Sequence, residues 1–353
     1  MYQALYRKWR PQTFADVIGQ QHITDTLRAQ LQSGRLSHAY LFTGTRGTGK
    51  TTCAKILARA VNCEHPVNGD PCNECAACRG ILDGSVLDVT EIDAASNNGV
   101  DNIRDLRDET RYTPAQVRKR VFIIDEVHML SIGAFNALLK TLEEPPEHVL
   151  FILATTELHK VPATILSRCQ RFDFRRIGAE DISRRLLDVA AGEGIALTEG
   201  AARLIARLAD GAMRDALSML DRAAAAGAVD EKTVTAALGV MGQDDGIRLA
   251  EHLKTGDLAA AVGLLDEYYN AGRDLASVYD QMLGLIRDAL LVKTSKTDVS
   301  ALISPAYSVK TLQALCDGLA SSTLIAWSRI ISDSLDHMRT AANRRVEAGL
   351  CAV

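Results

Sequence analysis

The chain has 353 residues, a net charge of −4 and 47% hydrophobic residues. This length exceeds the usual size of one hydrophobic core, so a multidomain soluble protein of two or three domains is expected. The slightly acidic balance excludes the broad basic field on which nonspecific DNA binding depends. Any contact with nucleic acid must therefore be local or shared with other subunits.

Neither a membrane segment nor a leader is expected. No run approaches the roughly 18 to 20 apolar residues that cross a bilayer, and the opening MYQALYRKWRPQ lacks the apolar core of a signal peptide. We therefore expect a cytoplasmic protein without membrane contact. Eight cysteines are present, four in one tight cluster and four scattered. That distribution is typical of one metal site plus ordinary thiols, so an oxidising compartment is not required.

Short apolar runs alternate with helical stretches between residues 39 and 174. The apolar runs are AYLFTG (39–44), VLDVTEID (86–93), VFIIDEV (121–127) and HVLFILATT (148–156). Helices are expected from residue 50 onward and over 135–144. Continuous apolar strands separated by helices indicate a parallel sheet that is covered on both faces. The first part of the chain is therefore predicted to be an α/β nucleotide-binding domain.

The strand signals stop after FDFRRIGAED. Helical spacing of apolar residues over 182–191, 198–208 and 213–226, broken by glycines, predicts a small helical domain. Glycine and aspartate at 238–246 mark a second break. Beyond it, helices are expected at 247–253, 258–270, 275–292, 309–319 and 323–348. The last domain is therefore predicted to be an all-helical bundle, whose amphipathic faces pack internally or against a partner subunit.

A complete phosphate-binding loop follows the first predicted strand and opens the next helix. Its residues are Gly44, Thr45, Arg46, Gly47, Thr48, Gly49, Lys50 and Thr51, with Thr52 next in the helix. Such glycines let backbone N–H groups and the helix N-terminus face the phosphates. We expect Lys50 to reach the β- and γ-phosphates of ATP, Thr51 to ligate Mg²⁺, and Thr52 to belong to the same binding site. The alternative is a glycine-rich turn with a chance lysine.

Two carboxylates end the third apolar run. Asp125 is expected to hold the Mg²⁺ shell, and Glu126 to polarise a water for attack on the γ-phosphate. Because Glu126 is present, hydrolysis is predicted and not nucleotide binding alone. Thr155 and Thr156 would lie beside the γ-phosphate, where they could orient the water, if their strand neighbours the one that ends at Asp125. For the two carboxylates and for the two threonines, the alternative is an ordinary strand end with no role in the site.

The clustered cysteines Cys63, Cys72, Cys75 and Cys78 have the spacing C-x8-C-x2-C-x2-C. Four thiolates with short x2 loops suit tetrahedral Zn²⁺ and leave no open position for catalysis, so a structural zinc module is predicted. An iron-sulfur cluster is the remaining chemical alternative. We expect this insert to be an outward structural or docking module with no part in the reaction.

The chain resembles the gamma/tau subunits of the bacterial DNA polymerase III clamp loader, an AAA+ ATPase family, over essentially its whole length. The shared motifs are YRKWRPQTFADVIGQ, GTRGTGKT, the four cysteines, EIDAASNNGV, IDEVHML, FNALLKTLEEPPEH, ATTE, TILSRCQRF and GAMRDALSMLD. The resemblance implies an AAA+ P-loop domain over 1–177 with the zinc module at about 63–78. It further implies a helical lid domain over 178–242 and an all-α collar or oligomerisation domain over 243–353.

The same resemblance implies an ATPase of the DNA polymerase III holoenzyme, a DNA-directed nucleotidyltransferase complex. Such subunits use ATP to open a ring-shaped sliding clamp and close it around primed-template DNA. The implied partners are delta, delta-prime and further gamma/tau copies in a pentameric ring, and the implied location is the replisome or nucleoid. The implied cofactors are ATP, Mg²⁺ and Zn²⁺.

The resemblance also implies roles for single residues. Arg168 resembles the arginine finger that reaches a neighbouring subunit's ATP, and Arg214 resembles the sensor arginine of the lid. Arg10, Pro11 and Ile18 resemble the segment around adenine and ribose. Without the family, these arginines would be interpreted as surface ion-pair residues and Arg10-Pro11 as a turn.

Thr156 occupies the position of the first sensor, where many AAA+ proteins have asparagine. Arg104 lies where related loaders direct positive charge toward DNA, although an exposed helix face is the alternative. Two other functions stay open, a branch-migration or helicase-type AAA+ motor and a scaffold subunit that does not hydrolyse ATP. The cysteine insert argues against the former, and the complete set of Lys50, Asp125 and Glu126 argues against the latter.

Overall fold

The computed structural model describes residues 3–225, 227–239, 243–295, 297–299, 302–304, 307–340 and 343–352. The chain forms two compact units, Met1–Ala228 and Val229–Val353. Among the described helices, none combines the length and the apolar character that crossing a membrane requires.

A parallel sheet forms the centre of the first unit, as the apolar runs predict. Its strands are β1 Ala39–Thr43, β2 Val89–Asp93, β3 Arg120–Asp125, β4 Val149–Thr155 and β5 Gln170–Asp173. The strand order is β2-β3-β4-β1-β5, and every pairing is parallel. The four predicted strands lie at β1 to β4, and β5 adds a short strand beside β1.

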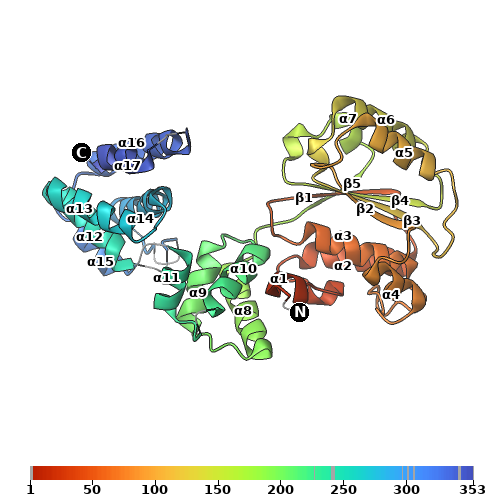
Figure 1. The fold of residues 1–353 in the computed structure, drawn as a ribbon, viewed down its shortest axis with the longest axis horizontal. Coiled ribbons are helices and arrows are strands. Elements are labelled where there is room, and N and C mark those ends of the chain that lie inside the picture. Colours follow the sequence, from red (N-terminus) through yellow and green to blue (C-terminus); the bar gives the residue numbers. More distant parts are fainter. Residues whose placement is uncertain are drawn as a thin grey trace. The chain divides into compact units, whose positions relative to one another are not determined.

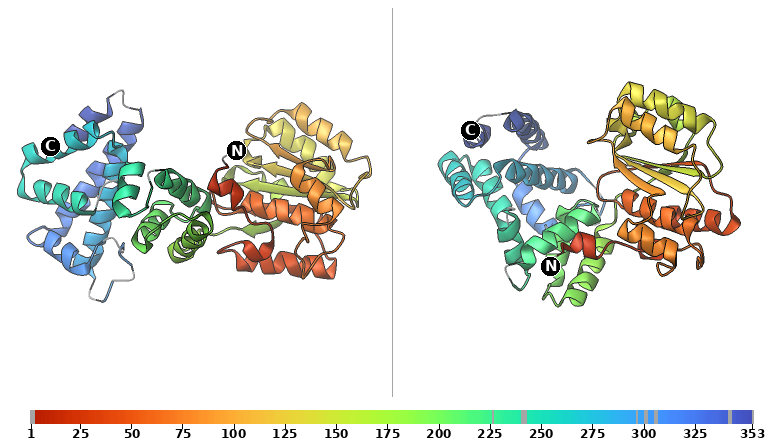
Figure 2. Two further views of the ribbon diagram at one scale, coloured as in Figure 1. Left: turned by 60° about the horizontal axis from the view of Figure 1, so that its bottom comes forward. Right: turned by 45° about the vertical axis from the view of Figure 1, so that its right-hand side comes forward.

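Helices cover both faces of this sheet (Figures 1 and 2). On one face lie α2 Gln21–Ser33 and α3 Lys50–Asn62, and on the other lie α5 Val100–Glu109, α6 Ile132–Glu143 and α7 Ala163–Leu166. Two further helices contact other helices: α4 Ala76–Asp83 lies beside α3, and α1 Leu5–Lys8 lies beside the later helix α10 Met213–Ala224. Side chains of β3 alternate between the two layers: Val121 and Ile123 pack with α2 and α3, whereas Phe122 and Ile124 pack with α5 and α6. Burial on both faces explains why the central strands β1, β3 and β4 are almost continuously apolar, whereas the edge strands β2 and β5 are more polar and partly exposed.

Three helices complete the first unit and confirm the predicted small helical domain. They are α8 Ala179–Glu193, α9 Glu199–Leu208 and α10 Met213–Ala224. Gly194 ends α8 in the left-handed conformation, with φ of 68°, and the Thr198 side chain caps α9 by accepting the N–H of Ala201. Both boundaries therefore follow from residue types that favour helix ends.

The second unit is helical throughout its described elements. They are α11 Glu231–Leu238, α12 Gln243–Thr255, α13 Leu258–Asn270, α14 Leu275–Thr294, α15 Val309–Cys316, α16 Ser321–Thr340 and α17 Arg344–Ala352. The core of this unit includes Val278, Met282 and Leu285 of α14, all fully buried. This confirms the predicted all-α C-terminal region.

Three of the helices predicted in this unit have limits that are wrong by three residues or more. The helix expected from residue 247 begins at Gln243. The helix expected over 309–319 ends at Cys316. The single helix expected over 323–348 is interrupted, because Asn343 is not helical and its side-chain oxygen accepts the N–H of Val346 at 3.3 Å, which caps α17. Residues 341 and 342, which the expected helix includes, lie outside the described residues. The domain limits at 177 and 242 stay predictions.

Candidate nucleotide site and cysteine cluster

Three strands bring the predicted nucleotide-binding residues to one edge of the sheet. β3, β4 and β1 are adjacent and parallel, so their carboxyl ends meet. The glycine loop follows β1, Asp125 ends β3, and Thr155 ends β4. In open α/β sheets, ligands bind at this edge. The direct pairing of β3 with β4 meets the condition on which the prediction for Thr155 and Thr156 depends.

The glycine loop adopts a backbone that requires glycine. Gly44, Gly47 and Gly49 have φ of 147°, 79° and 104°, values that side-chain-bearing residues rarely adopt. A Cβ on Gly47 would also lie 2.7 Å from the Cβ of Ala212, in the segment before α10, and the Gly47 carbonyl accepts the N–H of Met213 at 3.1 Å. The loop is therefore in direct contact with the small helical domain.

Lys50 begins α3 and is buried. Its Nζ donates to the carbonyls of Gly44 and Thr45 at 2.9 and 2.8 Å. Burial lowers the pKa of this amine, and the nearby charges of Glu126 and Asp125 oppose that shift. A cation held among carbonyl oxygens and carboxylates at a helix N-terminus suits the recognition of an anion.

The two acids at the end of β3 are held in different ways. The Thr51 hydroxyl donates to Asp125 Oδ2 at 2.8 Å, and the Glu126 N–H donates to Asp125 Oδ1 at 3.0 Å. Glu126 has φ of 48°, an unusual left-handed value for a glutamate. Thr156 donates to Glu126 Oε2 through its hydroxyl at 2.9 Å and through its N–H at 3.3 Å. The structure therefore brings Thr156 to Glu126.

His128 is a residue of this site to which no sequence pattern assigns a role. Its side chain is 5% exposed. Nδ1 lies 3.0 Å from Thr155 Oγ1 and 3.4 Å from Glu126 Oε2, while Nε2 lies 3.3 Å from Glu157 Oε1. The imidazole thus connects the ends of β3 and β4. Its position two residues after Glu126 is the one sequence signal that could have marked it.

A pocket opens beside the glycine loop. The predicted ATP-binding and acidic residues that line it are Arg10, Pro11, Ile18, Arg46, Gly47, Thr48, Gly49, Lys50, Thr51, Thr52, Asp125, Glu126 and Arg214. Gly44 and Thr45 are not among the lining residues and instead present their carbonyls to Lys50. Lining residues that the sequence patterns did not indicate are Tyr6, Trp9, Asp16, Val17, Ile177, Arg185, Met213 and Leu217.

Aromatic residues before Arg10 join the pocket to the helical domain. The Arg214 guanidinium lies 4.9 Å from the centroid of the Tyr6 ring, and that of Arg185 lies 5.3 Å from the Trp9 ring. Trp9 Nε1 donates to Glu193 at 2.7 Å. The predicted sensor arginine is therefore positioned by the N-terminal segment, through cation–π contact.

Arg168 lies away from the lining of this pocket. It follows α7, and its guanidinium donates to Glu143 at 2.6 Å and to the carbonyl of Thr164 at 2.7 Å. The side chain is 32% exposed. Its proposed target, the ATP of a neighbouring subunit, therefore stays a prediction.

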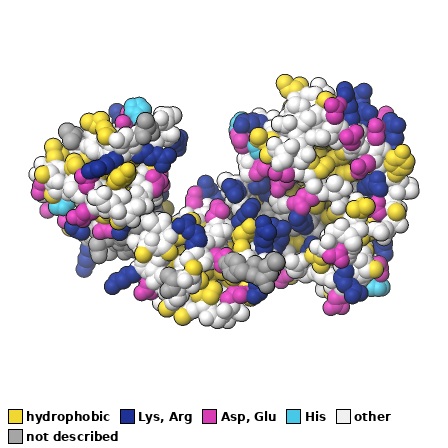
Figure 3. All heavy atoms as spheres, in the orientation of Figure 1, with side chains coloured by type: hydrophobic (Ala, Val, Ile, Leu, Met, Phe, Trp, Pro, Cys, Tyr) yellow, Lys and Arg dark blue, Asp and Glu magenta, His cyan; other side chains and the backbone are white. Residues whose placement is uncertain are grey.

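Arg104 lies on an exposed part of α5 and pairs with Asp101 at 2.9 Å. On the face drawn in Figure 3, basic and acidic side chains are interspersed. The structure therefore gives Arg104 an intrahelical partner, and the predicted contact with DNA stays untested.

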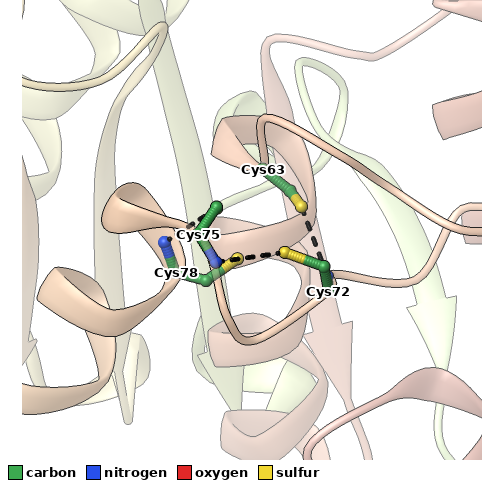
Figure 4. A group of neighbouring side chains, drawn as sticks. All are labelled: Cys63, Cys72, Cys75 and Cys78. Carbon is green, nitrogen blue, oxygen red and sulfur yellow. Dashed lines mark hydrogen bonds between the residues drawn. The ribbon is translucent and has the colours of Figure 1, made fainter.

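The four clustered cysteines converge (Figure 4). Their sulfurs all lie within 4.8 Å of one another, close to the spacing of about 3.8 Å that four Zn–S bonds of about 2.3 Å would give. The N–H groups of Cys72, Cys75 and Cys78 donate to the sulfurs of Cys63, Cys72 and Cys75. Backbone N–H groups of Glu74 and Cys75 lower the pKa of Cys72 to about 6, whereas burial raises the pKa of Cys63 and of Cys78 in the absence of a metal. A closed set of four thiols that accepts amide donors fits structural Zn²⁺.

Comparison with solved structures shows the class of the fold. The RuvB Holliday junction branch migration motor of Thermotoga maritima aligns over 69% of this chain and 79% of its own, with a TM-score of 0.51 and 16% identity. A single-residue variant of that protein aligns with the same values. The first unit therefore has an AAA+ fold, with a parallel sheet, a phosphate loop and a helical lid.

Sequence comparison gives the family. DNA polymerase III subunit tau of Bacillus subtilis is 49% identical over 98% of this chain and 62% of its own length. The corresponding subunit of Escherichia coli is 47% identical over 83% of this chain and 46% of its own length. DNA polymerase III subunit gamma of Buchnera aphidicola is 43% identical over 80% of this chain and 79% of its own length.

Three family models match successive segments: DNA polymerase III delta subunit over 19–178, the clamp loader subunit ATPase lid domain over 181–229, and domain III of subunits gamma and tau over 229–351. The chain belongs to the DNA polymerase III gamma/tau family. It spans 62% and 46% of the length of the Bacillus and Escherichia relatives.

Proposed function

We propose that this chain is an ATPase motor subunit of a bacterial clamp loader, which loads a sliding clamp onto primed-template DNA. The observation that carries the proposal is the meeting of Lys50, Thr51, Asp125 and Glu126 at one sheet edge, inside one pocket. Membership of the gamma/tau family supports the assignment to a clamp loader.

ATP is the proposed ligand of the pocket. The loop N–H groups and Lys50 would hold its phosphates. The wall formed by Arg10, Pro11 and Ile18 would hold the adenosine, with Arg214 reaching the nucleotide from the lid. Because the Gly47 carbonyl accepts the Met213 N–H, a shift of the loop on binding would move the lid.

Mg²⁺ would be held by Thr51 and Asp125. Their oxygens already lie 2.8 Å apart, and a hydroxyl beside a carboxylate is the oxygen donor set that Mg²⁺ takes in phosphate-loop proteins. When bound, the ion neutralises negative charge on the phosphates.

Hydrolysis is proposed to depend on Glu126, which accepts a proton from the attacking water. The two hydrogen bonds from Thr156 fix one oxygen of this carboxylate. His128 approaches the same oxygen at 3.4 Å. Thr156 therefore acts on the water through Glu126, which refines the sequence prediction that it orients the water itself.

Arg168 is proposed to complete the ATP site of a neighbouring subunit. Arg168 does not line its own pocket, and its contact is with exposed Glu143, which suits a cation that serves a neighbouring subunit. That arrangement requires a ring, for which we propose delta, delta-prime and further gamma/tau copies as a pentamer at the replisome. Phosphate contacts shared around such a ring would reconcile DNA binding with the acidic chain.

Substitution of Glu126 by Gln tests the proposal. The amide cannot take a proton from water but keeps the size of the side chain. We expect the variant to bind ATP with unchanged affinity and to lose turnover by at least about 100-fold in a reconstituted clamp-loader assembly. Wild-type assembly that binds ATP but does not hydrolyse it would contradict the motor function and favour a scaffold.

A further inference from the structure

A network of hydrogen bonds joins the cysteine insert to the wall of the nucleotide pocket. Residues 12–14 connect two parts of that wall, with Arg10 and Pro11 before them and Asp16, Val17 and Ile18 after them. The position of residues 12–14 therefore sets the position of the residues on both sides. Thr13 of this short link bonds locally to Asp16, whereas Gln12 and Phe14 are held by contacts that include residues of the insert.

Asp70 provides the first contact. It lies in the loop between Cys63 and Cys72, and its side chain is 13% exposed. Oδ1 accepts the N–H of Phe14 at 2.5 Å, and Oδ2 accepts from Arg28 of α2 at 2.6 Å. The Phe14 side chain is itself buried in the core. Asp70 therefore holds the backbone of Phe14, where the link formed by residues 12–14 enters the core.

Asn73 and Arg59 provide the second contact. Arg59, on the helix that begins with Lys50, is 4% exposed. Its guanidinium donates to the Gln12 carbonyl at 2.9 Å and to the Asn73 side-chain oxygen at 3.1 Å. Asn73 lies between two of the clustered cysteines and donates to the same Gln12 carbonyl at 3.2 Å. The carbonyl of Gln12 is thus held from both the insert and α3.

We propose that the cysteine insert is a metal-dependent brace of the adenosine side of the pocket, so that occupancy of the cysteine cluster and nucleotide affinity are coupled. This inference rests on the proposed ATP site. Without a metal, four thiols provide little to hold the loop that carries Asp70 and Asn73, since metal binding supplies most of the folding free energy of such modules. Buried Arg59 would then lose one of its partners.

Thermodynamic reciprocity gives the coupling a second consequence. If the bound metal raises nucleotide affinity by some factor, bound nucleotide must raise metal affinity by the same factor. At equilibrium with a competing chromogenic chelator, the chain should therefore bind Zn²⁺ more tightly when the pocket is filled. This readout does not depend on ATP turnover.

The experiment compares wild-type chain with Asp70→Ala and Asn73→Gly, where glycine suits the φ of 59° at residue 73. Glu74→Ala is the matched control, because Glu74 is an exposed acid of the same insert. Affinity for a fluorescent ATP analogue is measured on Zn²⁺-loaded and chelator-stripped protein. The affinity for Zn²⁺ is measured with and without Mg-ATP by equilibrium competition with the chelator, together with zinc content and far-UV circular dichroism.

We expect stripping to weaken nucleotide binding on the order of 10-fold, and Mg-ATP to raise the affinity for Zn²⁺ by the same factor. Asp70→Ala and Asn73→Gly should retain zinc but lose this coupling, whereas Glu74→Ala should match wild type. Any direct removal of zinc by ATP would act equally on all four proteins. Equal Zn²⁺ affinities with and without Mg-ATP in wild type that binds nucleotide would overturn the brace and leave the ATP site intact. Failure of Zn²⁺-loaded wild type to bind nucleotide would instead reject the proposed function.

Discussion

The hydroxyl of Thr156 donates a 2.9 Å hydrogen bond to the carboxylate of Glu126, so the acid at the end of β3 is held by the residue that follows β4. Both hydrogen bonds to Glu126 Oε2, from the hydroxyl and from the backbone, come from the same threonine, and His128 Nδ1 approaches this oxygen at 3.4 Å. The two strands are direct neighbours. The orientation of the proposed water-activating group is therefore a property of the sheet and not of a flexible loop.

Replacing Thr156 by Ala removes the shorter of these two bonds. Because Glu126 then keeps the backbone contact alone, we expect turnover to fall about 10-fold to 100-fold with ATP affinity unchanged. Thr156→Ser, which retains a hydroxyl, should keep most of the activity. Steady-state turnover and equilibrium ATP binding of the two variants decide this, and an Ala variant as active as the Ser variant would contradict the positioning role.

Substitution of Arg168 tests its proposed role in a neighbouring subunit's site without destabilising the fold. Its ion pair with Glu143 is exposed, and such pairs contribute at most about 1 kcal/mol to stability. Arg168→Ala should therefore leave unfolding and ATP binding of the chain unchanged. In the assembly, we expect it to lower clamp- and DNA-stimulated hydrolysis by about 1000-fold, as for other arginine fingers. Full stimulated hydrolysis by an assembly in which every copy of this chain carries Arg168→Ala would reject the trans mechanism.

The carboxylate of Asp88 should make the free energy of unfolding depend on pH. It accepts the N–H groups of Ala115 and Gln116 at 2.9 Å each and the Arg120 guanidinium at 2.8 Å. Burial alone would raise the pKa of Asp88, but Arg120 and the two amides outweigh it and hold that pKa below its ordinary value. The carboxylate therefore stabilises the fold above its ordinary pKa of 3.8, and the contribution is lost as pH falls through the folded-state pKa.

Asp88→Ala should accordingly lower the free energy of unfolding by about 3 kcal/mol at pH 7, because it leaves the half-buried Arg120 without its carboxylate partner and with the Glu109 carbonyl as its remaining acceptor. The difference from wild type should shrink as the pH is lowered below about 4. Urea unfolding at a series of pH values measures both effects. The exposed pair of Asp101 with Arg104 offers a control, since Asp101→Ala should change stability by less than about 0.5 kcal/mol. An Asp88→Ala cost that does not vary with pH would argue against the shifted pKa.

Local motifs account for what the sequence could predict. The loop from Gly44 to Thr51 specifies its own backbone through glycine, and the apolar runs specify buried strands, so residue order alone predicts both. The spacing of the four cysteines likewise predicts that they form one cluster. Each of these signals is confined to a few neighbouring residues.

Contacts between distant segments account for what the sequence could not predict. Trp9 meets Glu193 across 184 positions, and Phe14 meets Asp70 across 56; neither pair has a periodic pattern. The sequence signal of His128, its position two residues after Glu126, is weak, because a single histidine beside an apolar run is usual in protein cores. The break at Asn343 was missed because asparagine suits a helix cap but is also tolerated inside helices.

The central claim is that this chain converts ATP hydrolysis into clamp loading within an assembly. Its most direct test is the ATP turnover rate as delta, delta-prime, sliding clamp and primed-template DNA are added in turn to the chain. The account predicts slow turnover by the chain alone and a strong rise that requires all four additions. Turnover that is already maximal without clamp and primed DNA, or that stays absent when all are present, would contradict it.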